Sequence, residues 1–426
     1  MQSQKVTGVS AKFGLLEALH KLRPDLNMDT IADLIIDEPS YFRDHKDVHK
    51  AGIRAVRHYF QYGEKENRKL TYPRLGFSRL LSPNKVTKGK TVFFTSATDE
   101  NPSWIYRCLF PFKTEEFQNE NLFFSGTNLF SHLLLGFFTA RKAVFLRPTY
   151  TALTIYLIQL CRRIGVEVQF DYDDLLLPEF ARQRGACRSG LRTHREDFSE
   201  SLKQSSLALH ADSFTCSTEA IASELRKTNP NVTVRKNKLP LSMFSSREEI
   251  DTRAKSLKIE SRKLRILYLS GSNTHKRDFS TVMGPLVKLA QEYSNKFTIT
   301  FMGSLSDYSS LFRTIGVGSD MRSTVSFDKM LEIIPLHDLV IVPLEYSVFN
   351  HCKSNIKYIE SASQGVPVIA SSVTEFSSAI TNGVNGWLCD DEFQWYETLK
   401  HIVLNPSEVG ACGIRAFEHA KKEHSL

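Results

Sequence analysis

The sequence predicts an α/β fold in which two similar domains, each built on a parallel sheet, follow a helical N-terminal segment. From residue 91 onward, short apolar runs alternate with longer stretches of helical periodicity. Such alternation is typical of parallel sheets that helices cover on both faces. The length of 426 residues suits two or three domains of about 150 residues each.

Each predicted domain contributes five strands. They fall at 91–95, 143–147, 166–170, 213–216 and 232–234 in the first domain, and at 265–270, 297–302, 325–327, 339–342 and 366–370 in the second. Residues 151–164 and 281–293 have the length and the apolar spacing of helices. The polar stretch 245–263 lacks strong apolar periodicity, so we expect a linker between the domains there.

The chain is accordingly expected to have four parts. These are a helical N-terminal module with a basic linker (1–88), a first α/β domain (89–250), a second α/β domain (262–404) and a C-terminal helix (405–426). Ligands of parallel α/β sheets bind beyond the carboxyl ends of the strands. We therefore expect the functional residues to lie directly after strands.

The composition is that of a folded protein, with 41% hydrophobic and 24% charged residues. Seven cysteines at scattered positions do not suit a disulfide framework or a zinc cluster, and they indicate reduced thiols. The most apolar stretches, 129–140 and 150–161, are shorter than the ~20 residues of a membrane span. We expect a cytoplasmic protein that stays in solution or binds at a membrane surface.

The net charge of +8 is unevenly distributed. Residues 51–90 hold ten Lys and Arg and two acidic residues, whereas 301–400 hold six basic and twelve acidic residues. This asymmetry argues against a uniformly basic nucleic-acid binder and favours a local basic patch. The stretch 51–90 therefore predicts contact with an anionic membrane surface, with a solvated linker as the alternative.

A candidate phosphate site follows the strand at 265–270. The small residue Gly271 begins a turn that lets the backbone approach a ligand, and a helix start follows with unpaired N–H groups. Lys276 and Arg277 add positive charge. The loop predicts binding of a phosphate or a diphosphate, and the alternative is a polar loop with Asp278 as the helix N-cap.

A second candidate lies at 349–360. Lys353, Lys357 and Glu360 are spaced i, i+4 and i+7, which places them on one face of a helix. Gly365 is expected to end this helix. Two cations and a carboxylate suit a diphosphate and a ribose diol, and the alternative is a solvated face with an ordinary Lys–Glu pair.

A third candidate is the acidic group Asp171, Asp173 and Asp174, after the strand at 166–170. Three carboxylates could bind a metal ion or supply a general base. The alternative is a turn followed by a helix cap. The histidines lack zinc-ligand spacing, and no nucleophile elbow, Walker A loop or dinucleotide-binding glycine motif is present.

These motifs together resemble a known family. The loop 271–279, the segment 354–360, the run 365–371 and the turn 382–388 resemble the donor domain of GT-B glycosyltransferases, in particular the retaining glycosyl transferase group 1. The first α/β half resembles the acceptor domain more loosely. Residues 41–68 resemble a short helical module found beside enzymes of bacterial surface polysaccharides. The resemblance implies two Rossmann-like domains that face a cleft.

The resemblance also implies an activity. The expected enzyme is a hexosyltransferase-type glycosyltransferase that moves a sugar from a nucleotide-sugar to a bacterial surface glycan, such as the O-antigen of lipopolysaccharide or a capsule. The acceptor would be a glycan or a lipid-linked glycan. Retention, the absence of a metal or other cofactor, and a peripheral position at the inner face of the cell membrane are implied in the same way. No nucleic-acid partner is expected.

Residue roles follow from the resemblance position by position. Glu360 lies where the family's carboxylate binds the nucleotide ribose, and the basic residues of the two segments would neutralise the leaving diphosphate. The expected donor-binding set is Gly271, Ser272, Thr274, Lys276, Arg277, Asn350, Lys353, Ser354, Lys357 and Glu360. The expected catalytic set is Asp171, Asp173, Asp174 and His275.

One position departs from the family pattern. The wider family has a second glutamate eight positions before the ribose-binding one, and this chain has Cys352 there. A thiol cannot act as a carboxylate, so the departure affects the contact with the donor sugar. It leaves open a non-catalytic GT-B scaffold or glycan-binding subunit, and an epimerase or hydrolase on the same fold.

Overall fold

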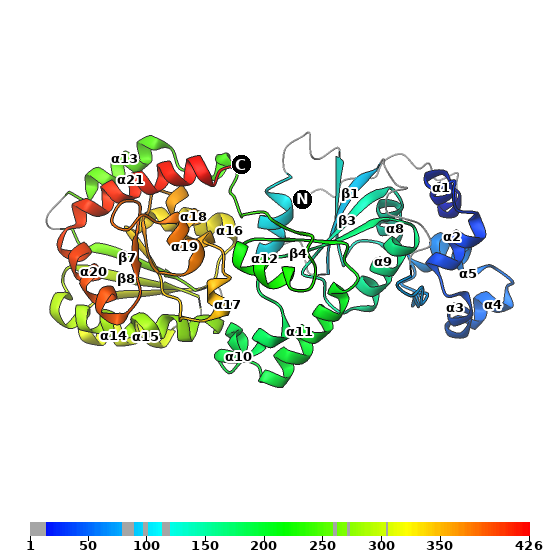
Figure 1. Cartoon of the computed structure of the whole chain (residues 1–426), viewed down its shortest axis with the longest axis horizontal. Coiled ribbons are helices and arrows are strands. Elements are labelled where there is room, and N and C mark those ends of the chain that lie inside the picture. The colour runs from blue at the N-terminus through cyan, green and yellow to red at the C-terminus, as the bar shows by residue number, and fades with distance from the viewer. Residues whose placement is uncertain are drawn as a thin grey trace. The chain divides into compact units, whose positions relative to one another are not determined.

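The structure is a computed structural model that describes residues 14–78, 89–96, 101–112, 120–258, 262–270, 273–303 and 306–426. The chain divides into two compact units (Figure 1). The first unit comprises residues 1–171 and 203–215, and the second comprises 172–202 and 216–426. The boundaries expected from the sequence, at 88, 250, 262 and 404, stay a prediction.

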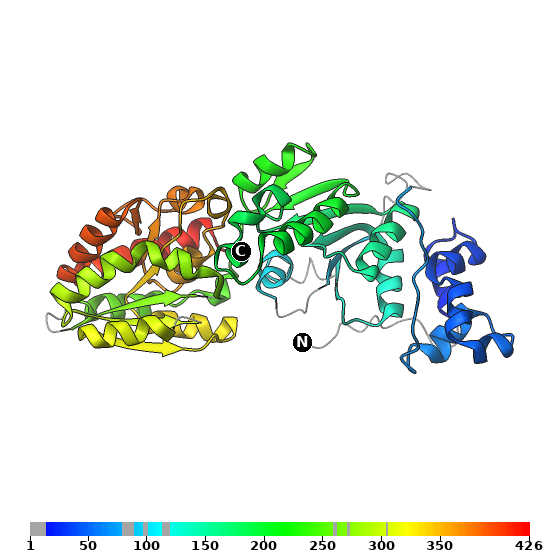
Figure 2. The ribbon, with the colours of Figure 1, turned by 90° about the horizontal axis from the view of Figure 1, so that it is seen from below.

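The first unit begins with short helices, as predicted. They are α1 (Leu15–Leu22), α2 (Met28–Ile35), α3 (Glu38–Asp44), α4 (Lys46–Lys50), α5 (Ala55–His58) and the π-helical turn η1 (Tyr59–Gly63). Figures 1 and 2 show these helices, in blue, beside α8 (Phe130–Phe138) and α9 (Ala152–Arg163). The Tyr156 hydroxyl donates to the Leu34 carbonyl at 3.0 Å, and the Ser131 hydroxyl donates to Glu64 at 2.7 Å.

The first sheet has six strands in the order β2-β1-β3-β4-β5-β6. They are β1 (Lys90–Thr95), β2 (Asn121–Ser125), β3 (Ala140–Leu146), β4 (Glu167–Tyr172), β5 (Ser213–Cys216) and β6 (Val232–Val234). The pairs β1–β2, β1–β3 and β3–β4 are parallel. Five of these strands fall where the apolar runs predicted them. The sequence analysis missed β2, because its apolar core of three residues is too short to separate from a loop.

The second sheet also has six strands, in the order β9-β8-β7-β10-β11-β12, and every neighbouring pair is parallel. The strands are β7 (Leu264–Leu269), β8 (Phe297–Met302), β9 (Gly318–Arg322), β10 (Leu339–Val342), β11 (Val368–Ser371) and β12 (Trp387–Cys389). This is the doubly wound order, in which the chain leaves the central pair β7 and β10 in opposite directions. The prediction of two parallel-sheet domains is therefore confirmed.

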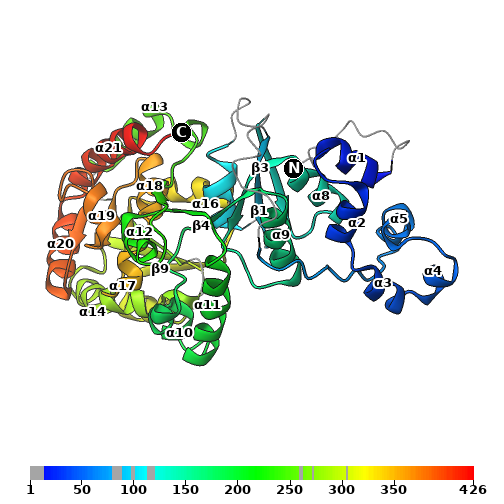
Figure 3. The same cartoon turned by 45° about the vertical axis from the view of Figure 1, so that its right-hand side comes forward.

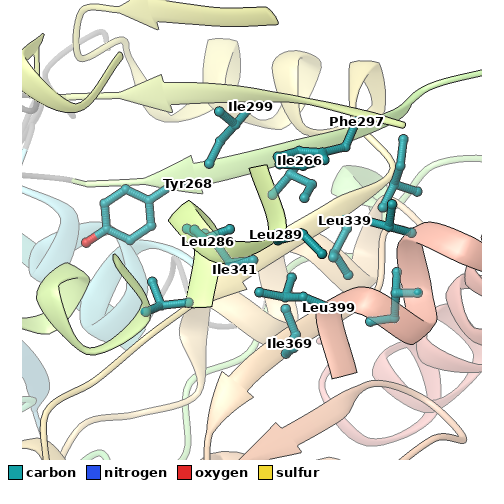
Figure 4. Close-up of a cluster of buried hydrophobic side chains, with 14 of the residues drawn as sticks. Ile266, Tyr268, Leu286, Leu289, Phe297, Ile299, Leu339, Ile341, Ile369 and Leu399 are labelled. Carbon is teal, nitrogen blue, oxygen red and sulfur yellow. The ribbon is translucent and has the colours of Figure 1, made fainter. Parts of the chain in front are cut away.

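The core of the second domain fixes the sheet against two helices. Helix α14 (Lys276–Tyr293) contributes Leu286 and Leu289, and helix α20 (Glu392–Leu404) contributes Leu399. Figure 4 shows these side chains packed against Ile266 of β7 and Ile341 of β10. Because all five side chains are almost fully buried, they hold the central strands and the two helices in a fixed relation.

The remaining helices complete the two units. They are α6 (Pro102–Trp104), η3 (Ile105–Leu109), η4 (Pro178–Gln183), α10 (Gly185–Arg188), α11 (His194–Ala208), α12 (Glu219–Arg226), η5 (Leu241–Met243), α13 (Arg247–Ser256), η6 (Asn273–His275), α15 (Ser306–Ile315), α16 (Phe327–Ile333), η7 (Ile334–Leu336), α17 (Val348–His351), α18 (Ile356–Ser363), α19 (Thr374–Ala379) and α21 (Pro406–Glu423). The expected C-terminal helix corresponds to α21.

One strand prediction is wrong, and the predicted linker contains a helix. The strand expected at 325–327 is a loop whose last residue begins α16. The strand at this edge of the sheet is β9, whose one large apolar residue is the partly buried Met321. The linker expected at 245–263 contains α13. A capping box between Ser246 and Glu249 starts this helix. Its one buried residue, Ile250, packs beside Gly365. A single buried apolar residue does not produce a visible apolar periodicity in the sequence.

Two further expectations concern the apolar stretches and the cysteines. Within the described parts of the chain, no helix combines the length and the apolar character that crossing a membrane requires. All seven cysteines are free thiols, and six of them are buried.

We expect Gly365→Ala to destabilise the second domain. Gly365 has a φ of +65°, and an added Cβ would lie 2.8 Å from two carbons of Ile250. The left-handed backbone and the clash together should lower the free energy of unfolding by about 2–4 kcal/mol. Urea unfolding in a Trp104→Phe background measures this, because the other two tryptophans, Trp387 and Trp395, belong to the core of this domain.

Gly383→Ala is the matched control. Gly383 has a φ of +75°, and nothing lies within 4 Å of its added Cβ. This variant should lose only the backbone contribution, about 1 kcal/mol. Equal losses in the two variants would contradict the packing argument.

Candidate functional site

The candidate site lies at the carboxyl ends of β7 and β10. These strands are neighbours and parallel, so the loops that follow them meet at one edge of the sheet. This edge is also where the chain order reverses, and such switch points form ligand-binding crevices in doubly wound sheets. After β7 come η6 and α14, and after β10 comes α17. Gly271 and Ser272 lie outside the described residues.

The buried carboxylate of Asp278 joins the two loops. Its Oδ2 lies 2.9 Å from Nδ1 of His275, in the loop after β7. Its Oδ1 accepts from the side-chain amide of Asn350 at 2.9 Å and from the backbone N–H of Glu345 at 3.2 Å. The Asn350 amide also donates to the Glu345 carbonyl at 2.7 Å. The loop after β10 is therefore held by a side chain of the first turn of α14, the helix that follows β7.

Arg188 of α10 completes this network. Its guanidinium lies 3.4 Å from Oδ1 of Asp278 and also forms an ion pair with Glu345. A close backbone approach accompanies the contact, because a Cβ on Gly185 would lie 2.9 Å from Thr274. Sequence analysis missed Arg188 and assigned Asp278 only the alternative role of a helix cap. The contact joins segments about 90 residues apart, and only a three-dimensional structure shows such a contact.

Two opposing effects act on the Asp278 carboxyl. Burial raises the pKa, whereas the hydrogen bond from His275 and the charges of His275 and Arg188 lower it. The net result is a pKa below the usual range of an aspartate. Asp278 is therefore ionised at neutral pH and holds its partners by charge-assisted hydrogen bonds.

Lys276 and Arg277 occupy the first turn of α14, and both side chains are exposed. Neither forms an ion pair with any carboxylate among the residues that the structure describes. The unpaired N–H groups and the positive dipole end of this 18-residue helix add to their charge. The loop thus keeps the positive potential that the sequence predicted. Thr274 is half-buried beside Gly185.

The helix expected across 349–360 is broken in two. Helix α17 ends at His351, and α18 begins at Ile356. Ser347 caps the first helix, and Asn355 precedes the second in a non-helical conformation. Asn and Ser side chains compete with the helical backbone for hydrogen bonds, which favours a turn at 352–355. Lys353 therefore lies in a turn, and the single face expected for it, Lys357 and Glu360 is wrong.

Lys357 and Glu360 remain together on α18. Nζ of Lys357 lies 3.6 Å from Oε2 of Glu360, whose side chain is 5% exposed. Helix α18 connects β10 to β11, so these residues follow the central strand β10 in the chain. The structure brings together the cation and the carboxylate that the sequence assigned to a diphosphate and a ribose.

Lys353 contacts the segment that follows β4. Its Nζ lies 4.0 Å from Oδ1 of Asp174 and 4.7 Å from the centroid of the Phe349 ring. Ser354 accepts a hydrogen bond from the Asn237 amide at 3.1 Å. These contacts fix the turn 352–355 to other parts of the second unit.

The acidic group 171–174 is divided between two environments. Asp171 is fully buried in the first unit, where Arg107 donates to both of its oxygens at 2.7 and 3.0 Å. The Thr215 hydroxyl donates to it at 2.6 Å. Asp173 and Asp174 are half-buried and belong to the second unit. Only Asp173 and Asp174 are accessible to a ligand, and a buried bidentate ion pair suits a structural role for Asp171.

Cys352 lies at the end of α17 and is buried. Burial raises the pKa of its thiol to about 12, so the thiol stays neutral. Its backbone carbonyl accepts a hydrogen bond from the Thr218 hydroxyl at 3.0 Å. The side chain thus supplies no negative charge at the position where the resemblance places a glutamate. Across the described ranges, no group of three or more His, Cys, Asp and Glu side chains is placed to hold a metal ion.

Comparison with known proteins supports the same domain. Residues 265–405 match the family described as Glycosyl transferases group 1, from β7 to just beyond α20. No curated protein matches the chain. The solved structures include HepE of Anabaena in complex with UDP, at 12% identity and a TM-score of 0.52, covering 79% of this chain and 96% of HepE. HepE with UDP and glucose gives 11% identity, a TM-score of 0.53 and the same coverage.

These comparisons confirm two predictions. At 12% sequence identity, the likeness to HepE shows the fold alone. This fold agrees with two Rossmann-like domains of the GT-B type. The family match confirms a glycosyltransferase domain of group 1 in the second half of the chain. The residue roles listed from the sequence stay predictions.

We expect Asp278→Asn to lower the free energy of unfolding of the second domain by about 3 kcal/mol at pH 7, because it removes the charge from a buried network. The pKa of Asp278 is lowered in the folded state. The ionised carboxylate therefore stabilises the fold fully above about pH 4, and this contribution is lost as the pH falls through the folded-state pKa.

Urea unfolding of the variant and the unmodified protein from pH 7 to pH 3, both in the Trp104→Phe background, measures the difference. The gap in free energy of unfolding between the two proteins should narrow below about pH 4. A gap that is constant across this range would contradict the charged network. Asp328→Asn, a change of an exposed aspartate in the first turn of α16, is the control.

Proposed function

We propose that this chain transfers a sugar from a nucleotide-sugar donor, and that the donor binds at the carboxyl ends of β7 and β10. One observation carries the proposal. The part of the chain that matches glycosyl transferases group 1 coincides with a switch-point site that holds cations and a buried carboxylate. The ionised Asp278 keeps the loops of this site together.

The charges suit the chemistry of such a reaction. Cleavage of the sugar–phosphate bond places negative charge on the departing diphosphate oxygen, and preorganised positive groups stabilise that charge. Lys276, Arg277 and the N-terminus of α14 supply positive potential after β7. Lys357 supplies it on the segment after β10. We assign these groups to the diphosphate, with Thr274, Asn350, Lys353 and Ser354 as supporting residues.

Glu360 is assigned to the ribose of the nucleotide. A buried carboxylate can accept hydrogen bonds from two neighbouring hydroxyls, and Nζ of Lys357 lies 3.6 Å from Oε2 of Glu360. HepE, whose fold is similar, crystallised with UDP and with UDP-glucose. We therefore take UDP as the first nucleotide to test.

The chemical step and the acceptor are assigned from the resemblance. We propose transfer with retention and without a metal ion to a bacterial surface glycan, such as an O-antigen or a capsule, in free or lipid-linked form. Asp173, Asp174 and His275 are the accessible catalytic candidates. His275 contacts Asp278, which fixes its ring orientation. Asp171, with its bidentate Arg107 partner, would act by holding the end of β4.

We also propose a cytoplasmic protein at the inner face of the membrane. Of the basic residues at 51–90, Arg54, Arg68 and Lys69 form ion pairs with carboxylates of the same module. Arg57, Lys65 and Arg74 are exposed, and they supply the charge that would contact anionic lipid.

A second candidate is a GT-B scaffold that binds a donor or glycan without catalysis. The neutral, buried Cys352 favours it, because the site lacks a carboxylate at that position. Release of the free sugar or transfer to an acceptor from radiolabelled UDP-glucose separates an active enzyme from this scaffold.

We expect Glu360→Gln to weaken UDP binding by about tenfold, since hydrogen bonds to a charged acceptor contribute about 1.5–3 kcal/mol. Lys357→Ala should weaken it similarly. Isothermal titration calorimetry with UDP, with and without Mg²⁺, measures both. Binding that is unchanged in both variants would contradict the assigned donor site.

A matched pair of controls exists on α16. Lys329 and Glu332 form the same i, i+3 pair in the same domain, but both side chains are exposed. Glu332→Gln and Lys329→Ala should bind UDP like the unmodified protein. A loss of the same size in these variants would show that the effect comes from general charge and not from the site.

A further inference from the structure

A basic groove lies in the N-terminal module, and it is lined by none of the residues assigned above. It is formed by α3 and α4, which Figures 1 and 3 show next to each other. Its volume is ≈ 490 Å³, and its lining residues are Pro39, Phe42, Arg43, Lys46, His49 and Lys50. We call it the α3–α4 groove. Four of the six lining residues are basic or histidine, so the groove is a candidate site for an anion.

The helical spacing explains this composition. Tyr41 and Val48 are buried and hold α3 and α4 against the rest of the module. The Tyr41 hydroxyl bonds to His58 at 3.0 Å. Within α3 and within α4, the lining residues recur at intervals of three and one, which places them on one face of each helix. The non-helical His45 joins the two helices, and the two faces together line the groove.

The acidic residues of these helices do not neutralise the basic residues that line the groove. Glu38 lies 3.5 Å from Arg54. Asp44 lies 3.2 Å from Lys69, and Asp47 lies 2.9 Å from Arg68. Both carboxylates thus pair with cations of the segment that follows α5. In the described part of the chain, Arg43, Lys46 and Lys50 form no ion pair with a carboxylate. Three positive charges therefore remain around one groove.

The groove is also prepared for a ligand. The Arg43 guanidinium donates to the Ser40 hydroxyl at 2.6 Å, and Ser40 donates to Asp37 at 2.5 Å. This relay orients the guanidinium and leaves most of its five donors available. The Phe42 ring, whose centroid lies 4.9 Å from that of His49, adds an apolar wall. Oriented guanidinium donors with neighbouring ammonium groups suit the oxygens of a phosphate.

We propose that the α3–α4 groove binds a phosphate group whose attached moiety packs against Phe42. The phosphate could belong to a soluble phosphate compound or to the headgroup of a phospholipid, and the same residues would bind it in both cases. This proposal is independent of the donor site, because none of its residues lies in the second unit.

Two triple variants test the proposal. The groove variant is Arg43→Ala with Lys46→Ala and Lys50→Ala. The control variant is Lys258→Ala with Lys263→Ala and Lys296→Ala, which removes the same charge from exposed residues of the second unit that have no assigned role. Circular dichroism and thermal unfolding establish that both variants fold, and a groove variant with Gln at the three positions replaces the first if it does not.

Each protein is titrated with inorganic diphosphate in saturating UDP, and is sedimented with phosphatidylcholine vesicles that contain phosphatidylglycerol. In at least one assay, the groove variant should bind at least about tenfold more weakly than the control variant. A selective loss with diphosphate indicates a soluble ligand, and one with vesicles indicates a lipid headgroup. Equal losses in the two variants, or no binding by the unmodified protein in either assay, would overturn the proposal.

Discussion

The candidate site depends on the buried, ionised carboxylate of Asp278. Two neighbouring parallel strands bring their loops to the same edge of a sheet, but the sheet itself does not fix the loops. Asp278 does so, because its oxygens contact His275, Asn350 and the backbone of Glu345. A buried carboxylate is tolerated only with such partners. The network that satisfies Asp278 is therefore the network that positions the loops after β7 and β10.

This arrangement separates two electrostatic tasks. The negative charge of Asp278 is compensated inside the protein, and Lys276 and Arg277 on the same helical turn stay exposed. In the proposed function, the donor diphosphate would contact those cations together with the N–H groups of α14. The Asp278 carboxylate would not repel the diphosphate, because His275 and Arg188 contact this carboxylate. On α18 the carboxylate of Glu360 is likewise buried, and the more exposed Lys357 lies 3.6 Å from it.

Much of the fold could be predicted from the sequence, because strands buried on both faces are continuous apolar runs. The strand β10 matches its predicted bounds, whereas β9 and β12 escaped prediction because short edge strands carry weak patterns. In the site, the two loops were predicted from their position after strands. The break at 352–355 was not predicted, because it follows from side chains that compete with the helical backbone for hydrogen bonds. The contact between Arg188 and Asp278 was not predicted either, because these residues are far apart in the sequence.

The division of the chain at 172–202 has a consequence for exchanging parts between related enzymes. This segment leaves the first sheet after β4 and contributes Arg188 to the second unit, and the chain returns at residue 203. No single cut therefore separates the two units. A chimera joined within 245–263 would receive a foreign α10, and its Asp278 would face whatever residue replaced Arg188. Recombination that preserves the site must transfer residues 172–202 together with the second sheet. The site is therefore built from two segments that are separated in the sequence.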